Sequence, residues 1–261
     1  SFHPETYLGK GKIQEVKEML DDELIVVAND ELTPLQISNL EEELQTAVYD
    51  RTYIILEIFK RRAQTKEAQL QVELATQKYL LPRLVGAHRG LSRQRGTGGG
   101  FARGRGSGEM KLELERRNIR DSIAKIKKEL SALTSLRQQQ RSRRKKMDMK
   151  IVSLVGYTNS GKSSTLNALL NYSTSLKKDV LEKDMLFATL ETATRFLKTP
   201  RNVQFLLTDT VGFVEKLPHH LVEAFKSTLE EITESDLILH IVDSSNPHYS
   251  KQIEVTNQVL K

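Results

Sequence analysis

The stretch Gly156-Tyr157-Thr158-Asn159-Ser160-Gly161-Lys162-Ser163 matches the pattern G-x-x-x-x-G-K-S of a phosphate-binding loop. The apolar run at residues 151–155 comes directly before it and is typical of a buried strand, and the residues after it predict a helix to about Leu170. A chance glycine-rich turn would account for the glycines but not for the strand and the helix on either side. The stretch therefore predicts a P-loop domain of the α/β class.

The residue types in this loop suit a phosphate group. Gly156 and Gly161 let backbone N–H groups approach phosphate oxygens, and the N-terminus of the following helix adds a dipole that favours negative charge. Lys162 is expected to neutralise the β- and γ-phosphates, and the Ser163 hydroxyl is expected to ligate Mg²⁺. The nucleotide-binding residues expected here are Gly156, Tyr157, Thr158, Asn159, Ser160, Gly161, Lys162, Ser163 and Ser164.

A second motif, D-x-x-G, follows an apolar stretch and covers residues 209–212. Asp209 is expected in the Mg²⁺ shell, and the Gly212 N–H is expected to bond the γ-phosphate and to be released after hydrolysis. Thr189 is the candidate for a switch hydroxyl that completes the metal shell, with an exposed loop threonine as its alternative. The catalytic candidates are Lys162, Thr189 and Gly212. The further nucleotide-binding candidates are Phe187, Ala188, Thr189, Leu190, Glu191, Asp209, Thr210, Val211 and Gly212.

Phe213 directly follows the D-x-x-G motif, at the place where many signalling GTPases have a glutamine that orients the attacking water. A phenyl ring offers no hydrogen bond, so we expect slow hydrolysis unless a partner completes the site, and we expect Phe213 to pack in the core. The neighbouring pair His219-His220 lacks the Cys, Asp or Glu spacing of a metal site. We interpret it as the start of a helix.

Composition sets limits on the whole chain. Its 261 residues include 40 Lys and Arg against 34 Asp and Glu, and the net charge of +6 allows an acidic partner without requiring one. The absence of cysteine excludes disulfides and thiolate metal sites and favours a reducing compartment. The longest apolar runs are strand-sized, so we expect no membrane span and a cytoplasmic, monomeric protein. The chain starts at Ser1 and stops within a helical pattern, which suggests a fragment.

The first 60 residues predict a small α/β unit. A helix containing Ile13 is followed by strand-like residues 24–28 and by a second helix. Thr33 supplies the N-cap of that second helix and Gln36 stands where a capping box requires it. After a second short strand, Asp50 is expected to cap a third, longer helix.

Residues 61–147 predict an arm made of two long helices. Apolar residues with heptad-compatible spacing, including Leu70 and Leu74 in the first helix and Ile119 and Ile126 in the second, favour an antiparallel hairpin. The expected loop at residues 86–108 holds most of the 14 glycines of the chain and no acidic residue. A flexible linker is one interpretation, but uncompensated cations suit the phosphates of structured RNA. The RNA-binding candidates are Arg89, Arg93, Arg95, Arg103 and Arg105. Residues 148–261 then form the P-loop domain, which we expect to be incomplete.

These segments resemble the HflX family of ribosome-associated GTPases over nearly the whole chain. The matching segments lie at residues 49–52, 58–59, 70–75, 79–84, 91–94, 108–109, 112–113, 116–117, 119–120, 186–190, 194–195, 209–213 and 217–219. The resemblance implies an N-terminal α/β domain, a helical hairpin and a GTPase domain of the translation-factor class. It also implies GTP hydrolysis with Mg²⁺, binding to the large ribosomal subunit and its RNA, and dissociation of stalled ribosomes under stress.

The chain departs from the family pattern in two places. Glu191-Thr192 stands where Asp-Pro is usual, and the glycine-rich loop carries more arginines than expected. No N/T-K-x-D sequence follows Asp243 to read guanine, because the chain stops at Lys261 before the strand expected to precede it. Guanine specificity therefore rests on the resemblance alone. Two alternatives stay open: an RNA- or ribosome-binding module with impaired nucleotide binding, and an unrelated P-loop ATPase, which the motif at residues 209–213 argues against.

Overall fold

The computed structural model describes residues 3–21, 23–94, 105–146, 149–173, 193–215 and 232–260. The chain forms two compact units. Residues 1–57 and 73–127 make up the first unit, and residues 58–72 and 128–261 make up the second. The predicted mixed α/β class, with an N-terminal region ahead of a P-loop domain, is confirmed. The division at residues 60 and 147 remains a prediction.

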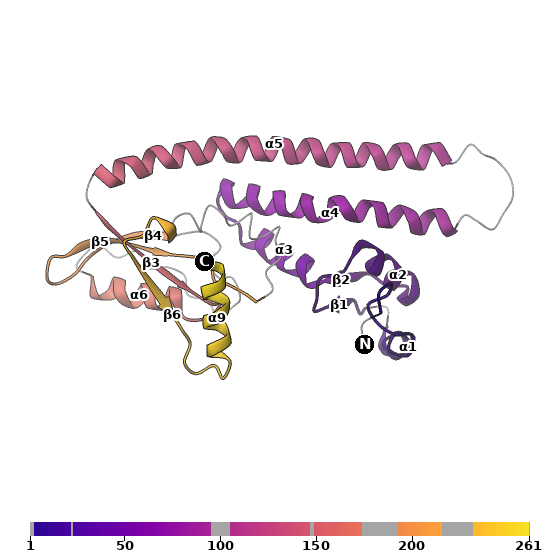
Figure 1. Cartoon of the computed structure of the whole chain (residues 1–261), viewed down its shortest axis with the longest axis horizontal. Helices are drawn as coiled ribbons and strands as arrows, with labels where there is room; N and C mark the ends of the chain where they lie inside the picture. The colour runs from indigo at the N-terminus through magenta and orange to yellow at the C-terminus, as the bar shows by residue number, and fades with distance from the viewer. Residues whose placement is uncertain are drawn as a thin grey trace. The chain divides into compact units, whose positions relative to one another are not determined.

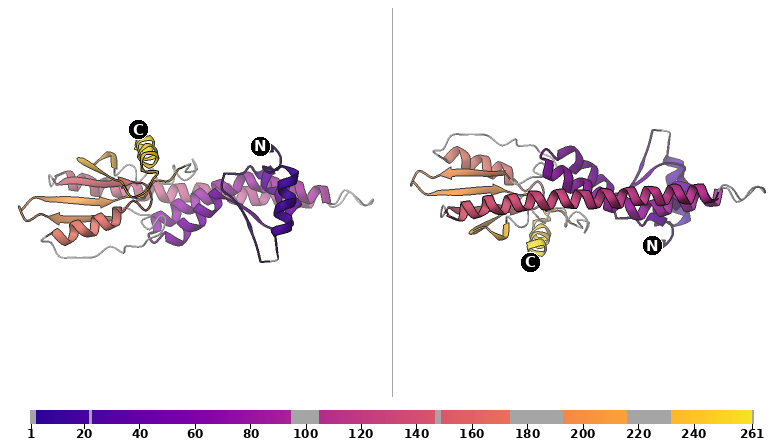
Figure 2. Two further views of the ribbon diagram at one scale, coloured as in Figure 1. Left: turned by 90° about the horizontal axis from the view of Figure 1, so that it is seen from below. Right: turned by 90° about the horizontal axis from the view of Figure 1, so that it is seen from above.

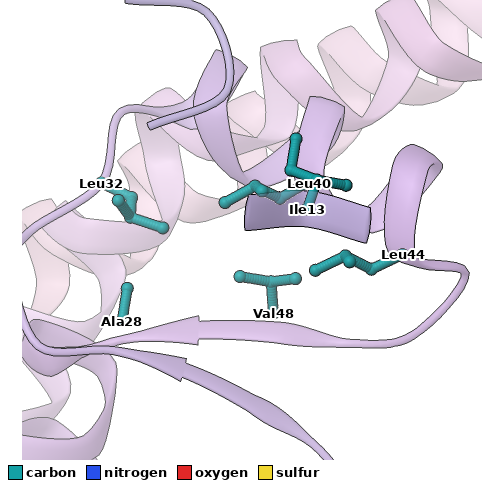
Figure 3. Close-up of a cluster of buried hydrophobic side chains, with 6 residues drawn as sticks. All are labelled: Ile13, Ala28, Leu32, Leu40, Leu44 and Val48. Carbon is teal, nitrogen blue, oxygen red and sulfur yellow. The ribbon is translucent and has the colours of Figure 1, made fainter. Parts of the chain in front are cut away.

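The first unit begins with two helices and two short strands. These are α1 (Lys10–Met19), β1 (Val26–Ala28), α2 (Pro34–Leu44) and β2 (Val48–Asp50). The strands pair in parallel with Val26 opposite Val48, and the helices cover one side of them. Figure 3 shows the core between helices and strands, formed by Ile13, Ala28, Leu32, Leu40, Leu44 and Val48.

Helix α2 begins as its sequence predicts. The Thr33 hydroxyl accepts the Gln36 N–H at 3.2 Å, and the Gln36 side chain accepts the Thr33 N–H at 3.0 Å, which completes the capping box. Pro34 occupies the first turn, where its missing N–H costs nothing. The helix ends at Gln45, which takes a left-handed conformation with φ of 54°.

Three further helices follow: α3 (Arg51–Arg62), α4 (Lys66–Gln94) and α5 (Arg105–Lys146). Within the first unit, α4 and α5 run antiparallel, which confirms the predicted hairpin (Figure 1 and Figure 2). The loop predicted at residues 86–108 was too long, because α4 continues to Gln94 and α5 already begins at Arg105. A helical glycine costs only about 1 kcal/mol relative to alanine, so two long helices can absorb several of them. Residues 95–104 lie outside the described part of the chain.

A buried network around Asp50 joins α4 to the end of β2 and the start of α3 within the first unit. The Asp50 carboxylate is fully buried and accepts hydrogen bonds from Leu32 N–H (3.1 Å), Tyr53 N–H (2.8 Å), Tyr79 hydroxyl (2.9 Å) and Arg83 Nη2 (3.1 Å). The bond from Tyr53 confirms Asp50 as the cap of α3. Arg83 also donates to the Leu32 carbonyl at 2.9 Å and stacks on the Tyr79 ring at 3.4 Å. Burial and the nearby Asp50 carboxylate raise the pKa of Tyr79.

The second unit contains a four-stranded sheet in the order β4-β5-β3-β6 (Figure 1). Its strands are β3 (Lys150–Gly156), β4 (Ala193–Lys198), β5 (Gln204–Asp209) and β6 (Leu237–Ile241). Strand β3 pairs in parallel with β5 and β6, and β4 is antiparallel to β5 across the turn at residues 199–202.

Helices cover both faces of this sheet. Helix α6 (Lys162–Tyr172) packs Leu166 and Leu170 against Leu154 of β3. On the opposite face, α9 (Tyr249–Leu260) packs against Val155, which points the other way because side chains alternate along a strand. The carboxyl ends of β3 and β5 lie at the same edge, where ligands bind in open α/β sheets. Over the described residues, every helix is too short or too polar to span a bilayer.

Candidate nucleotide-binding site

The loop at residues 156–163 connects β3 to α6 and requires glycine at positions 156 and 161. Gly156 has a φ of 153° and Gly161 a φ of 88°, both in the region that side chains disfavour. A Cβ on Gly156 would lie 2.3 Å from the Ile241 carbonyl oxygen, so the next strand leaves no space for one. Asn159 also has a positive φ, of 60°. Positive φ values at these positions let the chain turn sharply from β3 into the N-terminus of α6, the place where phosphate groups bind in such loops.

Lys162 is the first residue of α6 and is only 6% exposed. Its ammonium group donates to the Tyr157 carbonyl at 2.7 Å and to the Gly156 carbonyl at 3.3 Å. Burial lowers the pKa of Lys162 to about 8, and the Asp209 carboxylate opposes that shift. The group thus lies within the loop, where it can exchange carbonyl partners for phosphate oxygens.

Ser163 and Asp209 bring two oxygen ligands together at the edge of the sheet. The Ser163 hydroxyl donates to Asp209 Oδ2 at 2.9 Å, and Asp209 is fully buried at the end of β5. A hydroxyl and a carboxylate side by side fit Mg²⁺, which prefers oxygen ligands. The other oxygen ligands of a bound Mg²⁺ come from water and from phosphate. The structure therefore brings together two of the three predicted metal-binding residues.

The residues after Asp209 run close to the loop. The Thr210 hydroxyl donates to the Leu154 carbonyl at 2.6 Å and fixes the end of β5 beside β3. A Cβ on Gly212 would lie 2.6 Å from Thr158 Cα and 2.9 Å from Lys162 Nζ, so only glycine fits there. The backbone of residue 212 can therefore lie this close to the loop only because the residue has no side chain.

Phe213 is a core residue, 6% exposed, and it packs with Val155 and Ile232. This agrees with its predicted packing role. Its backbone N–H donates to the Gly156 carbonyl and its carbonyl accepts the Thr158 N–H. The ring presents no polar atom to a nucleotide.

Several predicted site residues lie outside the described part of the chain. These are Phe187, Ala188, Thr189, Leu190, Glu191, His219, His220, Arg95 and Arg103. Arg89 and Arg93 lie in α4 and Arg105 begins α5, but their side chains are not among those described. The switch threonine and the RNA-binding arginines therefore remain predictions.

Sequence reasoning missed one contact of the site. The Tyr157 hydroxyl accepts the Glu215 N–H at 3.3 Å, and the Glu215 carboxylate pairs with Lys251 of α9 at 3.0 Å. The second position of a P-loop accepts many residue types, so the pattern carries no signal for this contact.

Three family descriptions match the chain along its length. Residues 1–60 match the N-terminal region of GTP-binding GTPases, residues 62–144 match their middle region, and residues 151–261 match the family described as 50S ribosome-binding GTPase. A solved structure, the GDP complex of SsGBP, is 26% identical with a TM-score of 0.52, and the match covers 99% of this chain and 67% of that one.

Curated relatives are more similar still. GTPase HflX of Caldanaerobacter subterraneus is 50% identical over 97% of this chain and 58% of the relative. GTPase HflX of Lacrimispora saccharolytica is also 50% identical, over 100% of this chain and 60% of the relative. The chain thus spans about three-fifths of the length of these relatives. With half its residues identical from end to end and with the P-loop geometry above, the chain belongs to the HflX family of GTPases.

Proposed function

We propose that this protein hydrolyses GTP while bound to the large ribosomal subunit and that it separates stalled ribosomes under stress. The observation that carries the proposal is the loop at residues 156–163, with Lys162 buried inside it and the Ser163–Asp209 pair beside it. Membership of the HflX family supports guanine as the base and the ribosome as the partner.

Each residue of the site has a task in this reaction. Lys162 binds the β- and γ-phosphates, and Gly212 presents its N–H to the γ-phosphate. Ser163 and Asp209, with Thr189 as third ligand, hold Mg²⁺, which neutralises phosphate charge when it is bound. Phe213 cannot orient water, so the isolated protein hydrolyses GTP slowly and the ribosome supplies the missing group.

The arm is the second element of the proposal. Five arginines, Arg89, Arg93, Arg95, Arg103 and Arg105, lie in the stretch of residues 75–108, which contains no acidic residue. Such a segment binds phosphates of structured RNA and releases their counterions. We assign it to ribosomal RNA of the large subunit.

Nucleotide titration and turnover test the proposal. Labelled GTP should bind this protein more tightly than labelled ATP, and added large ribosomal subunits should raise GTP turnover strongly. Preference for ATP would indicate an unrelated ATPase. Binding to subunits without binding of either nucleotide would indicate an RNA-binding module. A turnover rate that is already maximal without subunits would contradict the role given to Phe213.

A further inference from the structure

Ser163 and Asp209, called here the metal pair, come from two different elements. Ser163 lies in the first turn of α6, which the P-loop connects to β3, and Asp209 is the last residue of β5. The Ser163 hydroxyl donates to Asp209 Oδ2 at 2.9 Å. The position of one member of the pair relative to the other therefore depends on how the end of β5 is held against β3.

A side-chain hydrogen bond attaches the end of β5 to β3. The last pair of the ladder between these strands is Leu154 opposite Asp209. One residue further on, the Thr210 hydroxyl donates to the Leu154 carbonyl at 2.6 Å. Thr210 is 1% exposed and Leu154 is fully buried, so this bond lies inside the second unit. The residue next to the metal ligand Asp209 is thereby fixed to the strand that carries the P-loop.

The sequence makes Thr210 a candidate for direct nucleotide binding, but the structure engages its hydroxyl with the backbone of β3. A hydroxyl donor that is buried and bonded in this way contributes to the geometry of the site through its neighbours. The neighbour on its N-terminal side is Asp209, whose carboxylate is fully buried beside Ser163. The effect of Thr210 on a bound nucleotide is therefore exerted through the metal pair.

We infer that Thr210 is a positioning residue that holds Asp209 in place for Mg²⁺ and thereby sets the metal affinity of the site. The inference rests on the proposed function, which includes the metal. Mg²⁺ requires near-ideal octahedral geometry with ligands at about 2.0–2.1 Å, so a small displacement of one ligand weakens binding. Loss of a residue that supports metal ligands typically lowers metal affinity about 10- to 100-fold.

Thr210→Val tests the inference, because valine has nearly the same size and lacks the hydroxyl. The dissociation constant of a non-hydrolysable GTP analogue is measured by calorimetry, once in excess Mg²⁺ and once in excess chelator. The ratio of the two constants gives the contribution of the metal, which bridges the β- and γ-phosphates when bound. This ratio should fall about tenfold in Thr210→Val, and the constant in chelator should stay unchanged. Thr210→Ser keeps the hydroxyl and should keep the ratio of the parent protein.

Thr208→Val is the matched control. Thr208 is buried in the same strand, and its hydroxyl is bonded to the Thr194 hydroxyl at 3.1 Å, so the variant also loses a hydroxyl contact of β5. Its ratio should equal that of the parent protein.

Two results would overturn the inference. One is an unchanged ratio in Thr210→Val, and the other is equal weakening with and without metal, which would make Thr210 a support of the loop alone. Circular dichroism checks that the variants fold, and Thr210→Ala, which also lacks the hydroxyl, replaces a valine variant that does not. A parent protein that binds neither the analogue nor GDP would instead refute the proposed function.

Discussion

Lys162 holds a positive charge in a place that disfavours it. Burial lowers its pKa to about 8, because the ammonium group is removed from water and carbonyl oxygens replace only part of its hydration. Phosphate oxygens stabilise the charged form and raise this pKa again. Above pH 8 the free protein therefore carries less charge at Lys162 than the nucleotide complex does.

We predict that nucleotide binding takes up a proton above pH 8 and weakens as the pH rises further. The sign follows from the lower pKa of the free form, which loses its proton first, so binding must restore it. Calorimetric titrations of GDP in buffers of different ionisation enthalpy measure the uptake. At pH 6.5, where Lys162 is charged in both states, the uptake should vanish. Uptake that is equal at both pH values would contradict the prediction.

Predictability from sequence differs among the residues of the site. Gly156, Lys162 and Ser163 could be assigned because their roles depend on neighbours within one loop, whose spacing fixes the geometry. The Tyr157 contact could not, because it joins residues 58 positions apart that only the β3–β5 pairing brings together. The same holds for Asp50, whose capping of α3 is local while Tyr79 and Arg83 come from a distant helix.

Among the elements, α4 is joined to the core of the first unit through one buried group, the Asp50 carboxylate. The Asp50 carboxylate is fully buried and the Arg83 side chain is 14% exposed, so loss of either charge leaves the other without compensation in the interior. The predicted caps of α2 and α3 are confirmed, since capping follows from a few consecutive residues. The predicted end of α4 was wrong. Glycine content indicates a weak local preference for helix, but packing against the rest of the protein supplies most of the stability of a long helix.

We predict that Asp50→Asn destabilises the protein by about 3–5 kcal/mol, the usual effect of breaking a buried ion pair. Urea unfolding followed by far-UV circular dichroism measures the loss. Glu43→Gln is the matched control, because Glu43 pairs with Lys17 at 3.4 Å with both side chains exposed. That variant should lose less than about 1 kcal/mol. Equal losses in both variants would refute a special role for Asp50.

The arm gives a second prediction at this scale. Replacing Arg89, Arg93, Arg95, Arg103 and Arg105 by Ser should weaken binding to large ribosomal subunits and flatten its salt dependence, because each lost phosphate contact removes released counterions. GTP affinity should not change. Sedimentation with subunits at several salt concentrations measures both effects. The control replaces five exposed cations elsewhere: Lys10, Lys12, Lys17, Lys60 and Arg201. If the arm were a plain linker, both variants would bind like the parent.

At the scale of the whole molecule, the two units have separate cores. The P-loop and the sheet that carries it belong to the second unit, while the Asp50 network belongs to the first. A ligand stabilises only the unit whose folding creates its site. We therefore expect this protein to unfold in two transitions, one for each unit, and not in a single transition.

We predict that GDP at 100 times its dissociation constant stabilises the second unit by about 2.7 kcal/mol and leaves the first unchanged. Calorimetric scans with and without GDP should show one transition that moves and one that stays. Asp50→Asn should lower the other transition only. A single transition that responds to both changes would show that the units unfold together.

The division of the chain also has a consequence for its synthesis. Residues 58–72 contribute to the second unit, but the rest of that unit begins only at residue 128. The first unit has all its residues once position 127 has been made, whereas residues 58–72, which include the buried Phe59 and Leu70, belong to a unit that is completed later. At about 5–20 residues per second, this delay is on the order of 10 s. A nascent chain of this protein therefore exposes Phe59 and Leu70 until the unit that contains them is complete.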